Sequence, residues 1–143
     1  MQTLGQLPRP LRLLAPLGVM ALLWVLSAIP APVGAGPAGF EIPPWLQNSL
    51  HVPAYATLCA AWLWVFDFND AIGLPGALTF VATVLYALID EWHQAWVPGR
   101  TSSLEDVLLD AVGAAALLGC VAWLGSSRAS HAWLASRSPD RSR

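Results

Sequence analysis

The sequence contains no lysine and little charge of either sign. Only 11% of its 143 residues are charged, against about 25% in a typical soluble domain, while 56% are hydrophobic. A chain of this composition has too little polar surface to cover a soluble globule and too much apolar surface to stay disordered. With a net charge of −2 it also lacks a basic surface for nucleic acid. We therefore expect one integral membrane domain, with the lipid bilayer as a partner and no nucleic acid.

Cysteine is equally scarce, and so are the motifs of familiar enzyme sites. The two cysteines, Cys59 and Cys120, lie at different depths in their predicted helices, so we expect free thiols that fill apolar space. The chain contains no H-E-x-x-H motif and no closely paired cysteines. Ser102 and Ser103 lack the G-x-S-x-G setting of a nucleophilic serine. From these absences we expect the protein to hold neither a metal ion nor another cofactor.

What the sequence does contain is long apolar runs. About 20 apolar residues in a helix cross the hydrocarbon core of a bilayer. Four segments approach that length, at residues 11–29, 50–66, 72–89 and 104–124. The fold class is therefore all-α, a polytopic membrane protein with a four-helix transmembrane bundle. Residues 31–48, which are rich in proline and glycine, and residues 94–103 are expected to be loops.

The positions of the arginines predict the orientation. Six of the seven arginines precede the first span or follow the fourth, and only Arg100 lies in a loop on the opposite side. Because positive charge favours the cytoplasmic side, both termini are predicted to be cytoplasmic, in a multi-pass protein of the cell (inner) membrane. This gives an N-terminal segment at 1–10, a membrane domain at 11–125 and a flexible cytoplasmic tail at 126–143. A cleaved signal peptide ending near Val33-Gly34-Ala35 is the alternative for the first span.

Three of the predicted spans carry polar residues three or four positions apart, which places them on one helical face. Such residues are costly at membrane depth and therefore informative. In the second span they are His51 and Tyr55, preceded by Asn48; in the third, Thr79, Thr83, Tyr86, Asp90 and Gln94; in the fourth, Asp106, Asp110 and Gly113. A stripe of small residues on the fourth span, at Ala111, Ala115 and Gly119, predicts a helix contact.

The polar faces converge at the outward end of the predicted bundle. We predict a ligand-binding site there, formed by His51, Tyr55, Asp90, Glu91, Gln94, Arg100, Asp106 and Asp110. Four of these are candidates for catalysis, namely His51, Asp90, Glu91 and Asp106. The same four could supply a mixed nitrogen and oxygen metal site, which no sequence spacing supports.

Each of these residues also has a structural interpretation. Arg100 either forms a buried ion pair with Asp106 or Glu91, or grips an anionic headgroup. His51 either bonds a carboxylate at the membrane interface or acts as a base or ligand. Asp106 and Asp110 either hold helices together by hydrogen bonds or belong to a functional site.

The segment from Asp90 to Val107 resembles the signature of the VanZ-like family. That pattern reads D-E-x-x-Q, then P-G-R, then S-x-x-D-V, with a polar residue four positions on and a glycine three after that. The matching residues are Asp90, Glu91, Gln94, Pro98, Gly99, Arg100, Ser103, Asp106, Val107, Asp110 and Gly113. Upstream, His51 and Tyr55 resemble the family's H-x-x-x-Y, and Ser27 and Pro30 its S-x-x-P. The chain departs from the pattern at Gln47-Asn48, where the family usually has Asp-Lys, so one expected cation is missing.

The resemblance implies a link to resistance against glycopeptides of the teicoplanin type, by analogy with the family's namesake. Together with the polar site, it favours binding or remodelling of an envelope lipid or a lipid-linked precursor at the outer leaflet. A membrane-embedded hydrolase using His51 and a carboxylate, with or without a metal, is the second hypothesis. A non-catalytic structural or partner subunit is the third.

Overall fold

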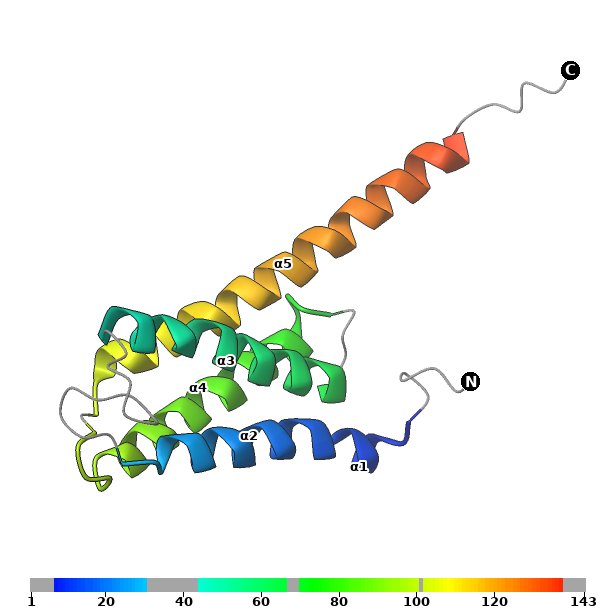
Figure 1. Ribbon diagram of the computed structural model, residues 1–143. Helices are drawn as coiled ribbons and strands as arrows, with labels where there is room; N and C mark the ends of the chain where they lie inside the picture. Colours follow the sequence, from blue (N-terminus) through cyan, green and yellow to red (C-terminus); the bar gives the residue numbers. More distant parts are fainter. Residues whose placement is uncertain (1–6, 31–43, 67–69, 101, 138–143) are drawn as a thin grey trace, which may run out of the picture.

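The computed structural model describes residues 7–30, 44–66, 70–100 and 102–137, and within them the side chains of all but Arg9, 44–48 and 128–137. Every secondary-structure element in these ranges is a helix, which confirms the all-α prediction. The helices are α1 (Arg9–Arg12), α2 (Leu14–Ser27), α3 (Pro44–Phe66), α4 (Leu74–Gln94) and α5 (Leu104–Arg137). Figure 1 shows them in order along the chain.

The described helices contain four segments that are long and apolar enough to cross a membrane, as the sequence predicts. They are Pro10–Ser27, Ser49–Phe66, Leu74–Gln94 and Leu104–Ser127. The first combines α1 and α2, which are separated at Leu13. The separation has a local cause, because Pro16 has no N–H to donate to the carbonyl of Arg12 one turn earlier.

Helix α3 is the centre of the bundle and packs against α2, α4 and α5. It begins at Pro44, before the predicted start at residue 50, so the predicted loop at 31–48 is wrong for its last five residues. Proline is favoured in the first turn of a helix, where its missing N–H would have no helical partner anyway. The remainder of that loop, and the segment Val33-Gly34-Ala35, lie outside the described residues.

The close packing of α5 on α3 depends on Gly113. A Cβ atom at this position would lie 2.3 Å from the carbonyl oxygen of Val52. The predicted contact through Ala111, Ala115 and Gly119 is wrong in its choice of face, since Ala115 and Gly119 are exposed. The helix instead turns Gly113 and its neighbour Ala114 inward.

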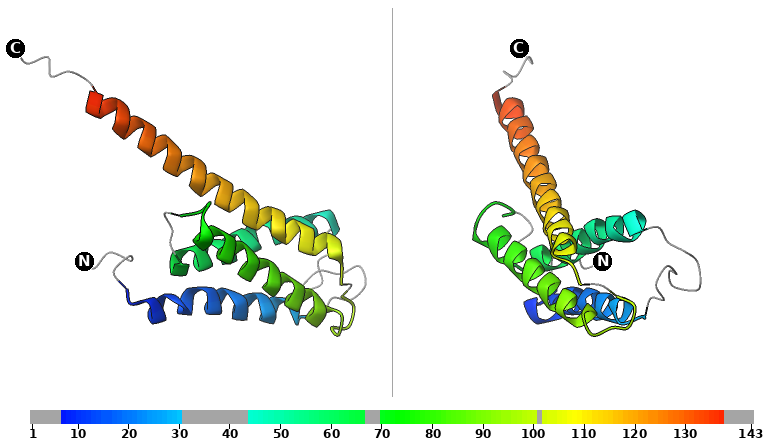
Figure 2. Two further views of the ribbon diagram at one scale, coloured as in Figure 1. Left: turned by 180° about the vertical axis from the view of Figure 1, so that it is seen from behind. Right: turned by 90° about the vertical axis from the view of Figure 1, so that its left-hand side faces the viewer.

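Helix α5 crosses the other spans obliquely and extends past them (Figures 1 and 2). Its 34 residues amount to about 51 Å of helix, more than the roughly 30 Å of a hydrocarbon core. Residues 126–137 are therefore helical, where the sequence predicted a flexible tail. A helix already formed is extended at little cost by residues such as Ala and Arg, which make up five of the twelve residues of this segment. The mobility of the segment stays a prediction.

The core and the lipid-exposed faces separate as expected for a membrane bundle. Tyr55, Leu58, Tyr86 and Val107 form the central apolar cluster together with Ala87. Large apolar side chains such as those of Leu14, Leu85 and Leu108 are exposed on the outside, where lipid chains would contact them. The polar face predicted for α4 is turned into the bundle and away from lipid, although the hydroxyl of Thr79 has no hydrogen-bond partner among the described residues.

Candidate functional site

The polar residues of four helices meet at one end of the bundle. Helices α2 and α4 end there, and α3 and α5 begin there (Figure 1). The sequence predicted this convergence, and the structure buries most of the predicted site. The buried members are Tyr55, Asp90, Glu91, Gln94, Asp106 and Asp110, and His51 is half-buried.

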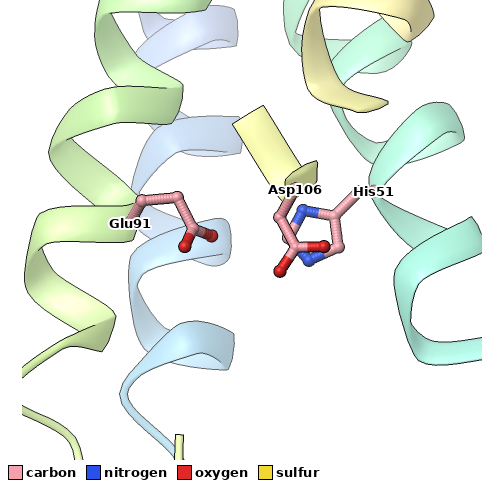
Figure 3. A group of neighbouring side chains, drawn as sticks. All are labelled: His51, Glu91 and Asp106. Carbon is pink, nitrogen blue, oxygen red and sulfur yellow. The ribbon is translucent and has the colours of Figure 1, made fainter. Parts of the chain in front are cut away.

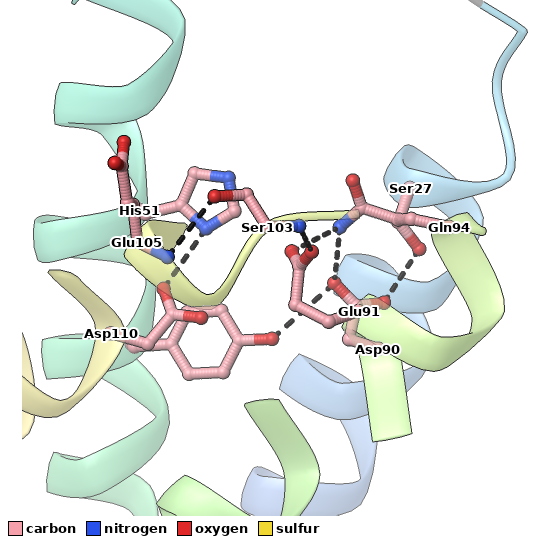
Figure 4. A network of polar contacts seen from close by, with 9 residues as sticks. Ser27, His51, Asp90, Glu91, Gln94, Ser103, Glu105 and Asp110 are labelled. Carbon is pink, nitrogen blue, oxygen red and sulfur yellow. Dashed lines mark hydrogen bonds and ion pairs between the residues drawn. The ribbon is translucent and has the colours of Figure 1, made fainter. Parts of the chain in front are cut away.

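Asp90 is fully engaged with other protein groups. Its Oδ1 accepts a hydrogen bond of 2.6 Å from the hydroxyl of Ser27 on α2. Its Oδ2 accepts from the hydroxyl of Tyr55 on α3 at 3.3 Å and from Nε2 of Gln94 at 3.0 Å. Figure 4 shows the bonds from Ser27 and Gln94 to Asp90. Asp90 therefore joins three helices, which is the hydrogen-bonded packing role that buried polar groups fill in membrane bundles.

Glu91, next in sequence, points to a different set of partners. Its Oε2 accepts the backbone N–H of Ser103 at 2.8 Å, just before α5 begins. Its Oε1 accepts a bond of 3.2 Å from Nε2 of Gln94. Glu91 thus fixes the start of α5 against the end of α4, and Gln94 lies between the two carboxylates (Figure 4).

His51 forms a pair with Asp110. Its Nδ1 lies 3.0 Å from Oδ1 of Asp110, which is almost completely buried. With Asp110 ionised, this contact has Nδ1 as the donor and leaves Nε2 as the ring nitrogen for a ligand or a proton. The pair orients the imidazole in the same way as a carboxylate does in a catalytic or metal-binding histidine.

Asp106 stands between these two groups. One ligand atom from each of His51, Glu91 and Asp106 lies within 4.8 Å of the other two. In Figure 3 the carboxylate of Asp106 overlaps the imidazole of His51, and the carboxylate of Glu91 points toward both. Among the described residues, Oδ1 of Asp106 is buried and has no hydrogen-bond partner. Asp90, the fourth residue in the sequence-based metal alternative, is not part of this group.

Arg100 has a different set of contacts from those considered in the sequence. Its Nη2 donates to the carbonyl of Leu26 at 3.1 Å, and its Nε to that of Ile29 at 3.4 Å. Leu26 lies in the last turn of α2 and Ile29 just beyond its end, so Arg100 adds a charged donor at the C-terminus of this helix. Arg100 therefore caps α2, and the ion pair with Asp106 or Glu91 is not formed in the described part of the chain. Gln47 and Asn48 lie in α3, but their side chains are outside the described residues.

Two contributors to this end of the bundle were not predicted as site residues. Ser27 is buried and binds Asp90, and its only sequence signal is the S-x-x-P pattern at the end of the first span. Trp24 stacks on His93, with ring centroids 3.8 Å apart, and no spacing rule connects two residues so far apart in the sequence. His93 is half-buried, and its Nδ1 lies 3.4 Å from the hydroxyl of Ser27; its interfacial position stays a prediction.

The fold and the site together define a multi-pass helical membrane protein with a buried histidine and carboxylate cluster at one end of its spans. The sequence model of the family described as VanZ/LLP1 matches residues 10–125. The chain belongs to this family, which confirms the resemblance seen in its motifs. No significant match is found among curated proteins or among solved structures.

Proposed function

We propose that this chain binds the headgroup of an envelope lipid or a lipid-linked precursor at the polar end of its bundle. With the termini on the cytoplasmic side, this end lies in the outer leaflet of the cytoplasmic membrane. The observation that carries the proposal is Asp106, a buried carboxylate with an unpartnered oxygen beside His51 and Glu91. A group of this kind is costly near a membrane unless something binds it.

The position of the site favours a lipid over a soluble molecule. His51, Glu91 and Asp106 lie in the first or last turns of membrane-spanning segments, close to the depth of lipid headgroups. The outer faces of the same helices are apolar, so a ligand with acyl or prenyl chains would contact protein along its whole length. The link to teicoplanin-type resistance comes from the family resemblance, and the proposal rests on lipid binding alone.

Native mass spectrometry of the purified full-length protein tests the proposal. Wild type should retain a lipid or lipid-linked species through detergent exchange, and Asp106→Asn should retain far less of it. Glu105→Gln is the matched control, because Glu105 is the neighbouring residue at the same end but is exposed. Equal retention by wild type and Asp106→Asn, both folded, would contradict the proposal. Loss of folded protein in Asp106→Asn alone would instead favour the structural-subunit hypothesis.

A hydrolase is the second candidate, favoured by the His51–Asp110 pair beside Glu91. An imidazole held by a carboxylate is suited to proton transfer, and Glu91 lies within reach of the same space. Glu91→Gln should then stop turnover without reducing expression. The identity of the retained lipid distinguishes a hydrolase from a protein that only binds lipid. In a hydrolase, Glu91→Gln would retain the intact substrate, whereas wild type would retain a product.

A further inference from the structure

The side chains of His51, Glu91 and Asp106 lie close enough together to bind a single metal ion. Ligand atoms on one tetrahedral ion, each about 2.1 Å from it, lie about 3.4 Å apart. The corresponding atoms here lie within 4.8 Å of one another, so small side-chain rotations bring them onto one ion. Each ligand comes from a different helix, α3, α4 or α5, and Figure 3 shows all three directed at a common space.

The unpartnered oxygen of Asp106 is an independent observation pointing to a cation. In a capping box, the acidic residue three positions after Ser103 would accept the Ser103 N–H. Here that N–H donates to Glu91 instead, while the Ser103 hydroxyl accepts the N–H of Glu105 at 3.0 Å. Asp106 therefore has no capping role, although its side chain is only 8% exposed and its Oδ1 is without a partner in the described chain.

The groups around the cluster hold its members as outer partners hold metal ligands. Asp110 binds Nδ1 of His51 and leaves Nε2 available, and Gln94 and Ser103 hold the carboxylate of Glu91. The arginine of the adjoining loop does not supply the missing positive charge, because Arg100 donates to the carbonyls of Leu26 and Ile29.

We infer that His51, Glu91 and Asp106 bind one divalent metal ion, Zn²⁺ or Mn²⁺. One imidazole and two carboxylates suit these ions, and three protein ligands leave coordination positions open. An open position would accept a phosphate oxygen, which the surrounding carboxylates would otherwise repel. This last step rests on the proposed function, whereas binding of the ion does not. The sequence predicted no metal because ligands from three helices share no spacing rule.

Titration of the full-length protein in detergent, stripped of metals with a chelator, tests the inference. We expect it to bind one Mn²⁺ per chain by electron paramagnetic resonance, and Zn²⁺ to displace that ion. Asp106→Asn should lower the affinity by about 100-fold or more, and Asp110→Asn, which alters an outer partner, by about 10-fold to 100-fold. Glu105→Gln should bind like wild type. Circular dichroism and size-exclusion chromatography establish that each variant is folded.

Several outcomes would overturn the inference. One is the absence of saturable Mn²⁺ or Zn²⁺ binding by folded wild type, and another is unchanged binding by Asp106→Asn. Glu91→Gln provides the same comparison if Asp106→Asn does not fold. Lipid retention measured with and without EDTA separates the two proposals. Lipid binding unaffected by EDTA in a protein that binds no metal would leave the proposed function and refute the metal site, whereas metal binding without any lipid would do the reverse.

Discussion

At the residue scale, the absence of a side chain at Gly113 sets how closely α5 approaches α3. A Cβ there would meet the carbonyl oxygen of Val52, a backbone atom that cannot move unless the helices separate. We expect Gly113→Ala to lower the free energy of unfolding by about 1–3 kcal/mol, as overpacking does elsewhere. The measurement is thermal unfolding of the detergent-solubilised protein followed by circular dichroism.

Gly119→Ala is the matched control on the same helix. A Cβ at Gly119 meets nothing within 4 Å, and alanine favours the helix more than glycine does. This variant should be as stable as wild type or slightly more stable. An equal loss of stability in both variants would contradict the prediction, because only Gly113 contacts Val52 and alanine at either position favours the helix.

The polar residues show what sequence spacing can and cannot predict. Spacing placed Asp90 and Asp106 on inward faces, and both are buried. The spacing did not predict that their hydrogen-bond partners differ, because those partners come from neighbouring helices. Asp90 accepts hydrogen bonds from the hydroxyls of Ser27 and Tyr55. The N–H of Ser103, which a capping box would direct to Asp106, goes to Glu91 instead. The partners of a buried carboxylate are a tertiary property.

At the element scale, Arg100 joins the loop between α4 and α5 to the end of α2. It donates to two carbonyls at the end of α2, and a cation at a helix C-terminus is stabilising by about 0.3–1 kcal/mol. Arg100→Ala should therefore lower the thermal midpoint modestly and leave metal affinity unchanged. Arg100→Lys, which keeps the charge but loses the paired donors, should be intermediate.

Thermal unfolding and lipid retention, measured on the same preparations, check this prediction. If Arg100→Ala loses lipid while its thermal midpoint stays at the wild-type value, Arg100 acts as the anion clamp that the sequence also suggested. In that case Arg100→Lys should also keep the thermal midpoint of wild type.

The helix ends were harder to predict than the helices. Apolar length alone was sufficient to identify four spans, because a bilayer core demands it. It did not predict that α3 begins at Pro44 or that α5 continues to Arg137. Both extensions lie in segments of mixed polarity, where helix formation depends on the first-turn preference of proline and on propagation from an existing helix rather than on apolar content.

At the scale of the whole molecule, the orientation predicted from the arginines can be tested by labelling. In a variant whose two free cysteines, Cys59 and Cys120, are replaced by alanine, single cysteines are introduced as Ser102→Cys or Ile72→Cys. Both positions are exposed and lie outside the spans. Ile72 precedes the start of α4 and Ser102 follows its end. An impermeant maleimide should label Ser102→Cys in intact cells and Ile72→Cys only after permeabilisation. The reverse pattern would invert the orientation, and labelling of both in intact cells would contradict the four-span topology.

The polar end also has a consequence for the order in which the protein is made. His51 and Glu91 emerge from the ribosome before Asp106 and Asp110, which both belong to the fourth span. Until that span is inserted, the imidazole of His51 lacks its partner Asp110. A chain terminated before Leu104 therefore leaves the imidazole of His51 without its carboxylate partner. The fourth span thus supplies the partner on which the histidine of the second span depends.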